Sequence, residues 1–474
     1  MPPWFHSPNY SIARVVLQRG IGLTYLVAFV VTLEQFRPLL GERGLLPVPE
    51  FLRRVRFREA PSLFHLRYSD RLLVVVAMVG ILLSITVVIG LPDRLPWPVG
   101  MTIWLILWAL YLSVCNVGQT FYSFGWETLL LEAGFLASFL GPSTIAVPAP
   151  LIWLFRWMLL RVELGAGLIK LRGDPCWRDL TCLYYHHETQ PMPNRLSWYF
   201  HHLPKLVHRG ELLGSHVAQL VAPILLFGPQ PIAAFAGIFV AVTQLWLVLS
   251  GNYAWLNFLT IVLAASALDD ATFSRVWPFG RTHANAVFAL HDGLCAAVTL
   301  LIAVLSYRPA RNLVSKVQLM NASFDPFHLV NAYGAFGSVT RKRYEVAIEG
   351  TTDVTVTTAT IWHEYEFRGK PTDPLRRPRQ WAPYHLRLDW LMWFAALSPA
   401  YAREWFVPLV LRLLENDPSI LRLLRSSPFP HRPPHAIRAT LYLYRFTTWR
   451  ERRETGASWV RTRVREYLPA MSLE

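Results

Sequence analysis

The stretch PLIWLFRWMLLRVELGAGLIK, residues 150–170, is long enough to cross a lipid bilayer as a helix. It carries charged residues seven positions apart, at Arg156, Glu163 and Lys170. Because a step of seven residues returns to nearly the same face of an α-helix, the three charges form one stripe about 21 Å long. A charge inside hydrocarbon costs about 2.5–3.5 kcal/mol, and such residues usually face a protein interior or a wet cavity. The stretch therefore predicts a membrane helix whose charged face is turned away from lipid.

The composition of the whole chain agrees with a membrane protein. Hydrophobic residues make up 53% of the 474 residues and charged residues only 16%, against about 25% in soluble domains. The long apolar runs lie almost entirely in the first two thirds of the chain. We therefore predict an α-helical multi-pass membrane domain over residues 1–310, followed by an α+β extramembrane domain with a β-rich part over residues 320–474. About nine spanning helices are expected, at residues 16–36, 72–90, 98–117, 121–140, 148–170, 212–229, 231–250, 253–268 and 286–306.

Two long connections, residues 37–71 and 171–211, interrupt the series of predicted spans. An odd number of spans puts the two chain ends on opposite sides of the membrane, so both connections are expected on the side of the C-terminal domain. Residues 37–71 contain eight arginines, and an excess of basic residues in short loops favours the cytoplasmic side.

The C-terminal third has the texture of a mixed domain. Alternating β-branched and aromatic residues predict strands at 343–350, 354–367 and 437–448. Apolar residues at helical spacing predict helices at 388–397 and 404–416, neither of which reaches spanning length.

The net charge of +15 arises mainly from 41 arginines, whereas lysines number only five. These arginines crowd the loops and the C-terminal third, where anionic lipid headgroups are the expected counterions. No nucleic-acid-binding motif accompanies the charge, so nucleic acid is not an expected partner. No nucleophile elbow, phosphate loop or dinucleotide fingerprint occurs either, and no cofactor is predicted.

The charged stripe has further ionisable neighbours inside predicted spans, at Arg161, Glu127 and Glu132. Three basic and three acidic groups allow a paired, buried network. Such a network can simply fix the register and packing of helices, or it can line a polar cavity that contains a base. Lys170 is the candidate base because desolvation lowers the pKa of a lysine toward neutrality. Glu163 is expected to orient Lys170 or to pair with the arginine of the stripe.

The connection over residues 171–211 holds the densest collection of reactive residue types. Cys176 and Cys182 are close enough in sequence to form a disulfide, or they are two buried thiols. The histidines of this segment match no standard zinc-ligand spacing, and adjacent histidines point in different directions, so no metal site is predicted. Several side chains are instead expected to line a polar cavity at the membrane interface. They are Trp177, Arg178, Asp179, Tyr185, His186, His187 and Glu188.

Two asparagines, Asn252 and Asn257, lie in the apolar segment SGNYAWLNFLT, residues 250–260. Since buried amides need hydrogen-bond partners, they are expected to bond neighbouring helices or a ligand. In the C-terminal third, HLRLDWLMW groups His385, Arg387 and Asp389 with two tryptophans.

Segments spread over residues 12–450 resemble the lipase maturation factor family. The matching stretches are RGLLPVPEFLRR, PSLFHLRYSD, FGWETLLLEAGFLA, GDPCWRDLTCLYYHHETQPMPN, SGNYAWLNFLT, NAYGAFGSVTRKRYEVAIEGT, HLRLDWLMWFAAL and PFPHRPPHAIRATLYLYRFTT. The resemblance implies a multi-pass membrane protein that helps secreted lipases to fold. It also implies a C-terminal domain that contacts the client and lies outside the cytoplasm, opposite to the side that the arginine count favours.

The family is also distantly similar to the membrane domain of vitamin K-dependent gamma-carboxylase. That enzyme has a catalytic lysine in a Gly-x-x-Lys-Leu context, which residues 167–171 match with Lys170 at the basic position. Its partner histidine has no counterpart in FGWETLLLEAG, which offers only Glu127 and Glu132. The alternative function that follows is a membrane enzyme for a quinone-like substrate with Lys170 as general base. The arginine-rich, lysine-poor composition indicates a bacterial genome and therefore a bacterial plasma membrane. For a eukaryotic chain, the resemblance implies the membrane of the endoplasmic reticulum.

Overall fold

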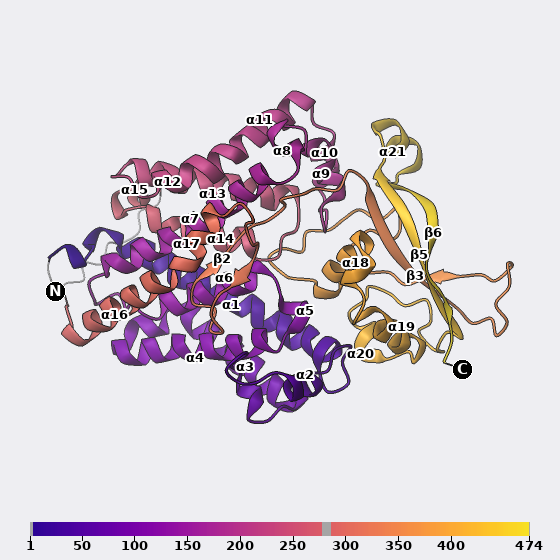
Figure 1. Ribbon diagram of the computed structural model, residues 1–474, viewed down its shortest axis with the longest axis horizontal. Helices are drawn as coiled ribbons and strands as arrows, with labels where there is room; N and C mark the ends of the chain where they lie inside the picture. Colours follow the sequence, from indigo (N-terminus) through magenta and orange to yellow (C-terminus); the bar gives the residue numbers. More distant parts are fainter. Residues whose placement is uncertain (1–2, 277–285, 474) are drawn as a thin grey trace.

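The helix that carries the charged stripe, α7 (Ala149–Arg172), lies in the middle of the helical part of the molecule (Figure 1). The computed structural model describes residues 3–276 and 286–473. Pro150 occupies the first turn of α7, where a missing amide hydrogen costs nothing. A Cβ atom at Gly165 would lie 2.3 Å from the carbonyl oxygen of Tyr333, so glycine lets the chain pack directly on this helix.

Five helical segments of the described residues are long and apolar enough to cross a membrane, judged by length and composition. Four contain or form the helices α1 (Ser11–Leu40), α3 (Asp70–Ile89), α4 (Trp97–Asn116) and α13 (Ile232–Ser250). The fifth joins α16 (Ala289–Leu305) to α17 (Tyr307–Val314). They correspond to the predicted spans 16–36, 72–90, 98–117, 231–250 and 286–306. The chain is therefore a helical protein with several candidate membrane spans.

The predicted count of about nine spans is not confirmed, because the other four segments are short, broken or charged. Residues 121–140 contain the end of α5 (Gln119–Tyr122) and the whole of α6 (Gly125–Ala137), which has only 13 residues and is buried on nearly every side. α7 is long enough but carries four charges between Arg156 and Lys170. Segment 212–229 divides into α11 (Lys205–His216), a π-helical turn (Val217–Val221) and α12 (Ala222–Leu225). Segment 253–268 forms α14 (Leu256–Ala264) and a 3₁₀ turn (Ala265–Ala267).

Short helices occupy the connections between these elements. They are α2 (Val48–Arg54), α5 (Gln119–Tyr122), α8 (Pro175–Arg178), α9 (Leu183–Thr189), α10 (Ser197–His201) and α15 (Asp270–Val276).

The C-terminal part contains an antiparallel sheet with the strand order β4-β3-β5-β6. Its strands are β4 (His363–Glu364), β3 (Arg343–Thr351), β5 (Ala436–Phe446) and β6 (Trp459–Met471). The helices α18 (Arg387–Leu397) and α19 (Phe406–Leu414) pack against β3 and β5, followed by α20 (Pro418–Leu421), while α21 (Trp449–Thr455) joins β5 to β6. A two-stranded ladder, β1 (Ala322–Ser323) with β2 (Asn331–Ala332), precedes the sheet.

The strands predicted at 343–350 and 437–448 and both predicted helices are confirmed, whereas the strand predicted at 354–367 is wrong. Only His363 and Glu364 of that segment pair with β3; residues 352–359 leave the sheet and are exposed. Strand β6 was missed because it lies at the sheet edge, where charged side chains face solvent and mask the alternation.

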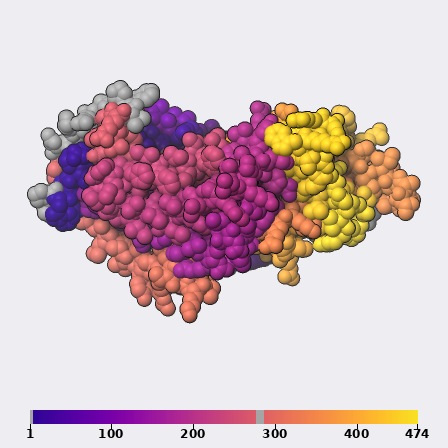
Figure 2. Space-filling model, turned by 90° about the horizontal axis from the view of Figure 1, so that it is seen from above, coloured from indigo at the N-terminus to yellow at the C-terminus, as the bar shows by residue number. Residues whose placement is uncertain are grey.

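The helical part and the sheet lie at opposite ends of an elongated molecule (Figure 2), with α18 between them (Figure 1). Both long connections reach the C-terminal part. The indole of Trp198 donates to the Thr447 carbonyl at 2.9 Å, and Arg412 donates to the Arg43 carbonyl at 2.7 Å. These contacts agree with the expectation that both connections share the side of the C-terminal residues.

Candidate functional site

Lys170 lies at the end of α7 and is only 7% exposed. Its Nζ atom donates to Oε1 of Gln219 at 2.9 Å and lies 4.7 Å from the centre of the Trp177 ring. Gln219 belongs to the π-helical turn after α11, an irregularity that occurs frequently at functional sites. A Cβ atom at Gly167 would lie 2.7 Å from Leu220, so the glycine lets this turn approach the helix.

The aromatic wall beside Lys170 is held by a disulfide. Cys176 and Cys182 are joined, with their Cα atoms 4.9 Å apart, and Trp177 between them is buried. This resolves the alternative between a bridge and two thiols that the sequence left open. Arg178 and Asp179, which follow Trp177, are exposed and stand apart from the lysine.

His186 continues the polar cluster away from Lys170. Its Nε2 atom lies 3.2 Å from the hydroxyl of Tyr253, which donates to Gln190 at 2.6 Å. Gln190 in turn donates to the Ser250 carbonyl at 2.8 Å. Burial lowers the pKa of His186 to about 3, so the ring is neutral at physiological pH. We call Lys170, Trp177, His186, Gln219 and Tyr253 the junction cluster, since it lies where α7 meets the connection over residues 171–211.

Three other predicted site residues of this connection lie outside the junction cluster. Glu188 accepts from the backbone amide of Phe446 at 2.6 Å and thus fastens the connection to β5. Burial raises the pKa of this carboxyl. Tyr185 is half-buried and packs beside Arg341. His187 turns toward His208 and Glu211 on α11.

The three charges of the stripe do not form ion pairs with one another within the described residues. Arg156 donates to the carbonyls of Ser266 and Leu226 at 2.9 and 3.0 Å and to the Tyr10 hydroxyl at 2.7 Å. It therefore joins helix ends together and does not pair with Glu163, in contrast to one of the two pairings expected from the sequence.

Glu163 accepts from the amide of Gln244 at 2.6 Å, and Asn257 donates to the same side chain of Gln244 at 2.7 Å. Glu163 thus holds α13 and α14 and makes no hydrogen bond to Lys170, so the second expected pairing is not seen either. Asn257 bonds a neighbouring helix, as expected for a buried amide.

Glu132 and Glu127 bind arginines outside the stripe. Glu132 pairs with Arg161 and accepts from the Tyr333 hydroxyl at 2.8 Å, so the ion pair joins α6, α7 and the segment after β2. Glu127 pairs with Arg387 of α18 at 2.8 Å and also accepts from the hydroxyl of Tyr111. Glu132 thus pairs with Arg161 inside the set of six charges that the sequence singled out, whereas Glu127 pairs with an arginine of the C-terminal part.

Arg387 and His385 were not identified as site residues from the sequence. His385 Nδ1 lies 3.6 Å from Glu127, and burial lowers the pKa of the imidazole to about 4. Asn252 likewise reaches the C-terminal part: its Oδ1 accepts from the amides of Trp381 and Ala382 at 2.7 and 2.9 Å. The only signal in the sequence was the grouping of charged residues in HLRLDWLMW.

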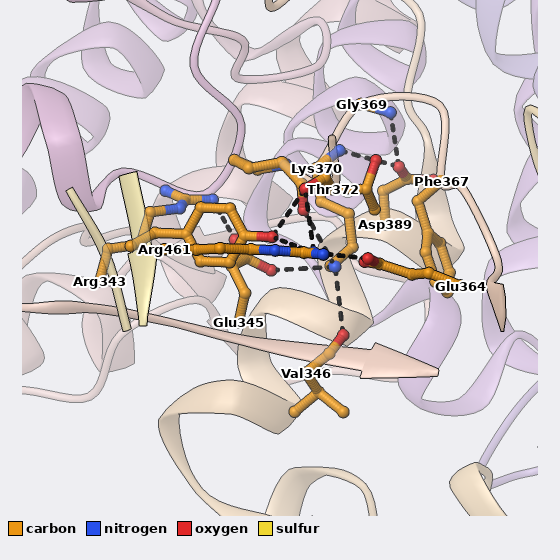
Figure 3. A network of polar contacts seen from close by, with 12 residues as sticks. Arg343, Glu345, Val346, Glu364, Phe367, Gly369, Lys370, Thr372, Asp389 and Arg461 are labelled. Atoms are coloured by element: carbon orange, nitrogen blue, oxygen red, sulfur yellow. Dashed lines mark hydrogen bonds and ion pairs between the residues drawn. The ribbon is translucent and has the colours of Figure 1, made fainter. Parts of the chain in front are cut away.

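A second polar network lies under the sheet, as Figure 3 shows. Arg343 of β3 pairs with Glu345 and donates to the carbonyls of Glu188 and Pro191 at 3.1 Å each. Lys370 lies 3.2 Å from the other oxygen of Glu345. This network attaches the sheet to the connection that carries the junction cluster.

Asp389 of α18 fixes the chain around Lys370. Its Oδ1 atom accepts from the amides of Gly369 and Lys370 at 2.6 and 3.0 Å (Figure 3). Burial raises the pKa of Asp389. Arg343 donates to the Gln190 carbonyl, and Tyr253 of the junction cluster donates to the Gln190 side chain, so the network under the sheet meets the junction cluster at Gln190.

Comparison with known families and proteins gives matches over both parts of the chain. Residues 12–275 match a family described as the lipase maturation factor transmembrane domain, and residues 329–469 match the lipase maturation factor C-terminal domain. Human lipase maturation factor 1 is 38% identical over 517 residues, covering 100% of this chain and 90% of the human protein. The Bos taurus protein of the same name is also 38% identical, and human lipase maturation factor 2 is 29% identical over 600 residues, covering 98% of this chain and 83% of the relative. No solved structure matches.

Proposed function

Because the chain belongs to the lipase maturation factor family, we propose that it is a membrane-embedded factor that assists the maturation of a secreted, lipase-like enzyme. The observation that carries this proposal is 38% identity to lipase maturation factor 1 over the whole chain, so that both the helical part and the sheet are shared. The alternative, an enzyme with Lys170 as base for a quinone-like substrate, is not favoured by these relatives.

The client surface that we propose lies on the C-terminal part. Residues 352–362 leave the sheet between β3 and β4 and carry exposed apolar side chains, with Val354 75% exposed and Ile361 68% exposed. Exposed apolar side chains that lie together on one loop are suited to transient contact with a partly folded enzyme.

The experiment co-expresses the chain with a secreted lipase in cells that lack their own maturation factor. Wild-type chain is expected to increase the lipase activity in the medium, whereas Val354→Ser combined with Ile361→Ser is expected to reduce the increase and the co-purification of lipase. Val464→Ser is the matched control, because Val464 is also an exposed apolar residue but lies on β6, away from this loop in the sequence. No increase with the wild-type chain refutes the proposed function.

For the membrane arrangement, we propose that residues 1–310 form the membrane domain and residues 320–474 the extramembrane domain, outside the cytoplasm. In this arrangement α6, α7, α14 and the helices over 205–225 complete about nine segments inside the bilayer; α7, with 24 residues, is about 36 Å long. The disulfide in the connection over 171–211 supports an oxidising side. Protease added to intact cells is expected to cleave residues 320–474, and protection of this region contradicts the orientation.

Lys170→Met separates the maturation role from the enzymatic alternative. If Lys170 only packs on Trp177 and bonds Gln219, the variant is expected at normal levels with its maturation activity largely kept. A variant present at normal levels but inactive contradicts a factor that acts through its C-terminal surface alone.

A further inference from the structure

Three side chains from two elements converge beside the junction cluster. His187 extends from α9, whereas His208 and Glu211 lie on one face of α11, three residues apart. One ligand atom from each residue lies within 4.8 Å of the other two. Both histidines are 2% exposed, so the site is closed to bulk solvent on the histidine side.

The hydrogen bonds of His208 place a lone pair against a carboxylate. Its Nε2 atom lies 3.4 Å from the carbonyl oxygen of His201; because a carbonyl can only accept, Nε2 carries the hydrogen. When the ring carries no second proton, Nδ1 presents a lone pair, and this atom lies 3.4 Å from Oε2 of Glu211. Two acceptors at this distance repel each other unless a cation, either a proton or a metal ion, lies between them.

His187 supplies the independent observation. Among residues 3–276 and 286–473, neither of its ring nitrogens has a hydrogen-bond partner, although the side chain is buried. An unsatisfied buried polar group costs about 1–3 kcal/mol, so native proteins rarely leave one without a partner. The Nε2 atom is directed at the same carboxylate and lies 3.5 Å from Oε1 of Glu211.

The carboxylate itself is held in place from a third element. The indole nitrogen of Trp246 on α13 donates to Oε1 of Glu211 at 2.6 Å. Metal-binding histidines usually donate their second nitrogen to a backbone carbonyl, and metal-binding carboxylates are usually hydrogen-bonded in turn. His208 with the His201 carbonyl, and Glu211 with Trp246, reproduce both features.

We propose that His187, His208 and Glu211 bind one divalent transition-metal cation of the zinc class and leave one coordination position open. Two histidines and one glutamate form a known ligand set for tetrahedral zinc. In a tetrahedral site with zinc bonds of about 2.0–2.2 Å, the ligand atoms lie about 3.3 Å from one another. The ligand atoms of the three residues lie within 4.8 Å of one another, so they must approach by up to about 1.5 Å when the ion binds. The bound ion ties α9 to α11 and so fixes the connection beside Lys170.

The set escapes recognition in the sequence because one ligand is distant. His208 and Glu211 have the spacing of a single helical turn, but His187 precedes them by a segment that includes all of α10. Only the folding of α9 against α11 brings the third ligand to the other two.

The test uses the full-length chain purified in detergent, stripped with a chelator and then incubated with Zn²⁺. After gel filtration, the wild-type chain is expected to retain about one zinc per molecule, measured by mass spectrometry of the metal. Co²⁺ in place of zinc is expected to give the visible absorption of a four-coordinate site. Zinc is expected to raise the unfolding temperature of the wild-type chain.

The variants Glu211→Gln and His208→Asn are expected to lose zinc retention at least about tenfold and to lose the thermal shift. Glu211→Gln keeps an acceptor for Trp246 and so preserves the fold, as gel filtration of the metal-free form checks. His202→Asn, in the same connection but stacked on Trp198, is the matched control and is expected to bind like the wild type. The proposal is overturned if the wild-type chain retains no zinc, or if Glu211→Gln retains as much as the wild type; a proton then bridges the three residues.

Discussion

The ion pair between Glu127 and Arg387 is expected to hold the C-terminal part against the helical part. Both side chains are fully buried, and their charged atoms lie 2.8 Å apart. Arg387 also donates to the Phe121 carbonyl at 2.7 Å, and its guanidinium lies 3.4 Å from the centre of the Tyr122 ring. The perturbations are Arg387→Met, Glu127→Gln and the two combined.

Removal of one partner leaves the other charge buried without compensation. Breaking such a pair costs about 3–5 kcal/mol, which is about a 100- to 4,000-fold change in the folding equilibrium. The double variant carries neither charge, so its cost is expected to be smaller than the sum of the two single costs by about 2 kcal/mol or more. Arg450→Met is the matched control, because its pair with Glu454 is exposed and is expected to contribute at most about 1 kcal/mol.

The assay is denaturant unfolding of the purified chain in detergent, followed by tryptophan fluorescence. Limited proteolysis in parallel reports whether residues 320–474 detach before the helices unfold. The reasoning is refuted if Arg387→Met costs no more than Arg450→Met, or if the two single costs simply add in the double variant.

Three further outcomes are expected from buried groups of the same molecule. Arg161→Met is expected to cost about 3–5 kcal/mol in the same unfolding assay, because it leaves the buried Glu132 carboxylate without its cation. Adding Glu132→Gln should recover part of this loss, and the prediction fails if the costs of the two single variants simply add in the double variant. Burial lowers the pKa of His385 to about 4, so on acidification the unfolded chain binds a proton at this residue before the folded chain does. The unfolding free energy should therefore fall by up to about 3 kcal/mol from pH 6.5 to pH 4. His385→Gln should reduce this fall, and an equal fall in the variant contradicts the reasoning. Serine at both Cys176 and Cys182 should lower the unfolding free energy by about 2 kcal/mol, and reductant should do the same to the wild type but not to the variant.

Features that depend on neighbouring residues could be predicted from the sequence. The charged stripe was correctly assigned to one helix, and β3 and β5 were found from alternation, because helix and strand periods are set by local backbone geometry. Predictions failed where local pattern and surroundings disagree. The run over 354–367 has the composition of a strand, but the described part of the sheet pairs with only two of its residues.

Hydrophobicity predicted burial correctly but did not distinguish protein from lipid as the surroundings. α6 is as apolar as a membrane span, yet Leu129, Leu130 and Leu131 are completely buried by other helices. An apolar run has the same composition in a protein core and in a bilayer, so hydrophobicity alone could not show that α6 is surrounded by other helices.

The sequence by itself determined the family, the helical membrane character and the presence of charges on one face of α7. Only the tertiary structure decided which partner each charge has. Glu127 pairs with Arg387, 260 residues away, and not with the stripe; Lys170 bonds Gln219 on a turn that the sequence predicted as part of a continuous span. The physical reason is that periodicity and hydrophobicity act between neighbours in the chain, whereas the cost of a buried charge depends on groups that only folding brings within hydrogen-bond distance.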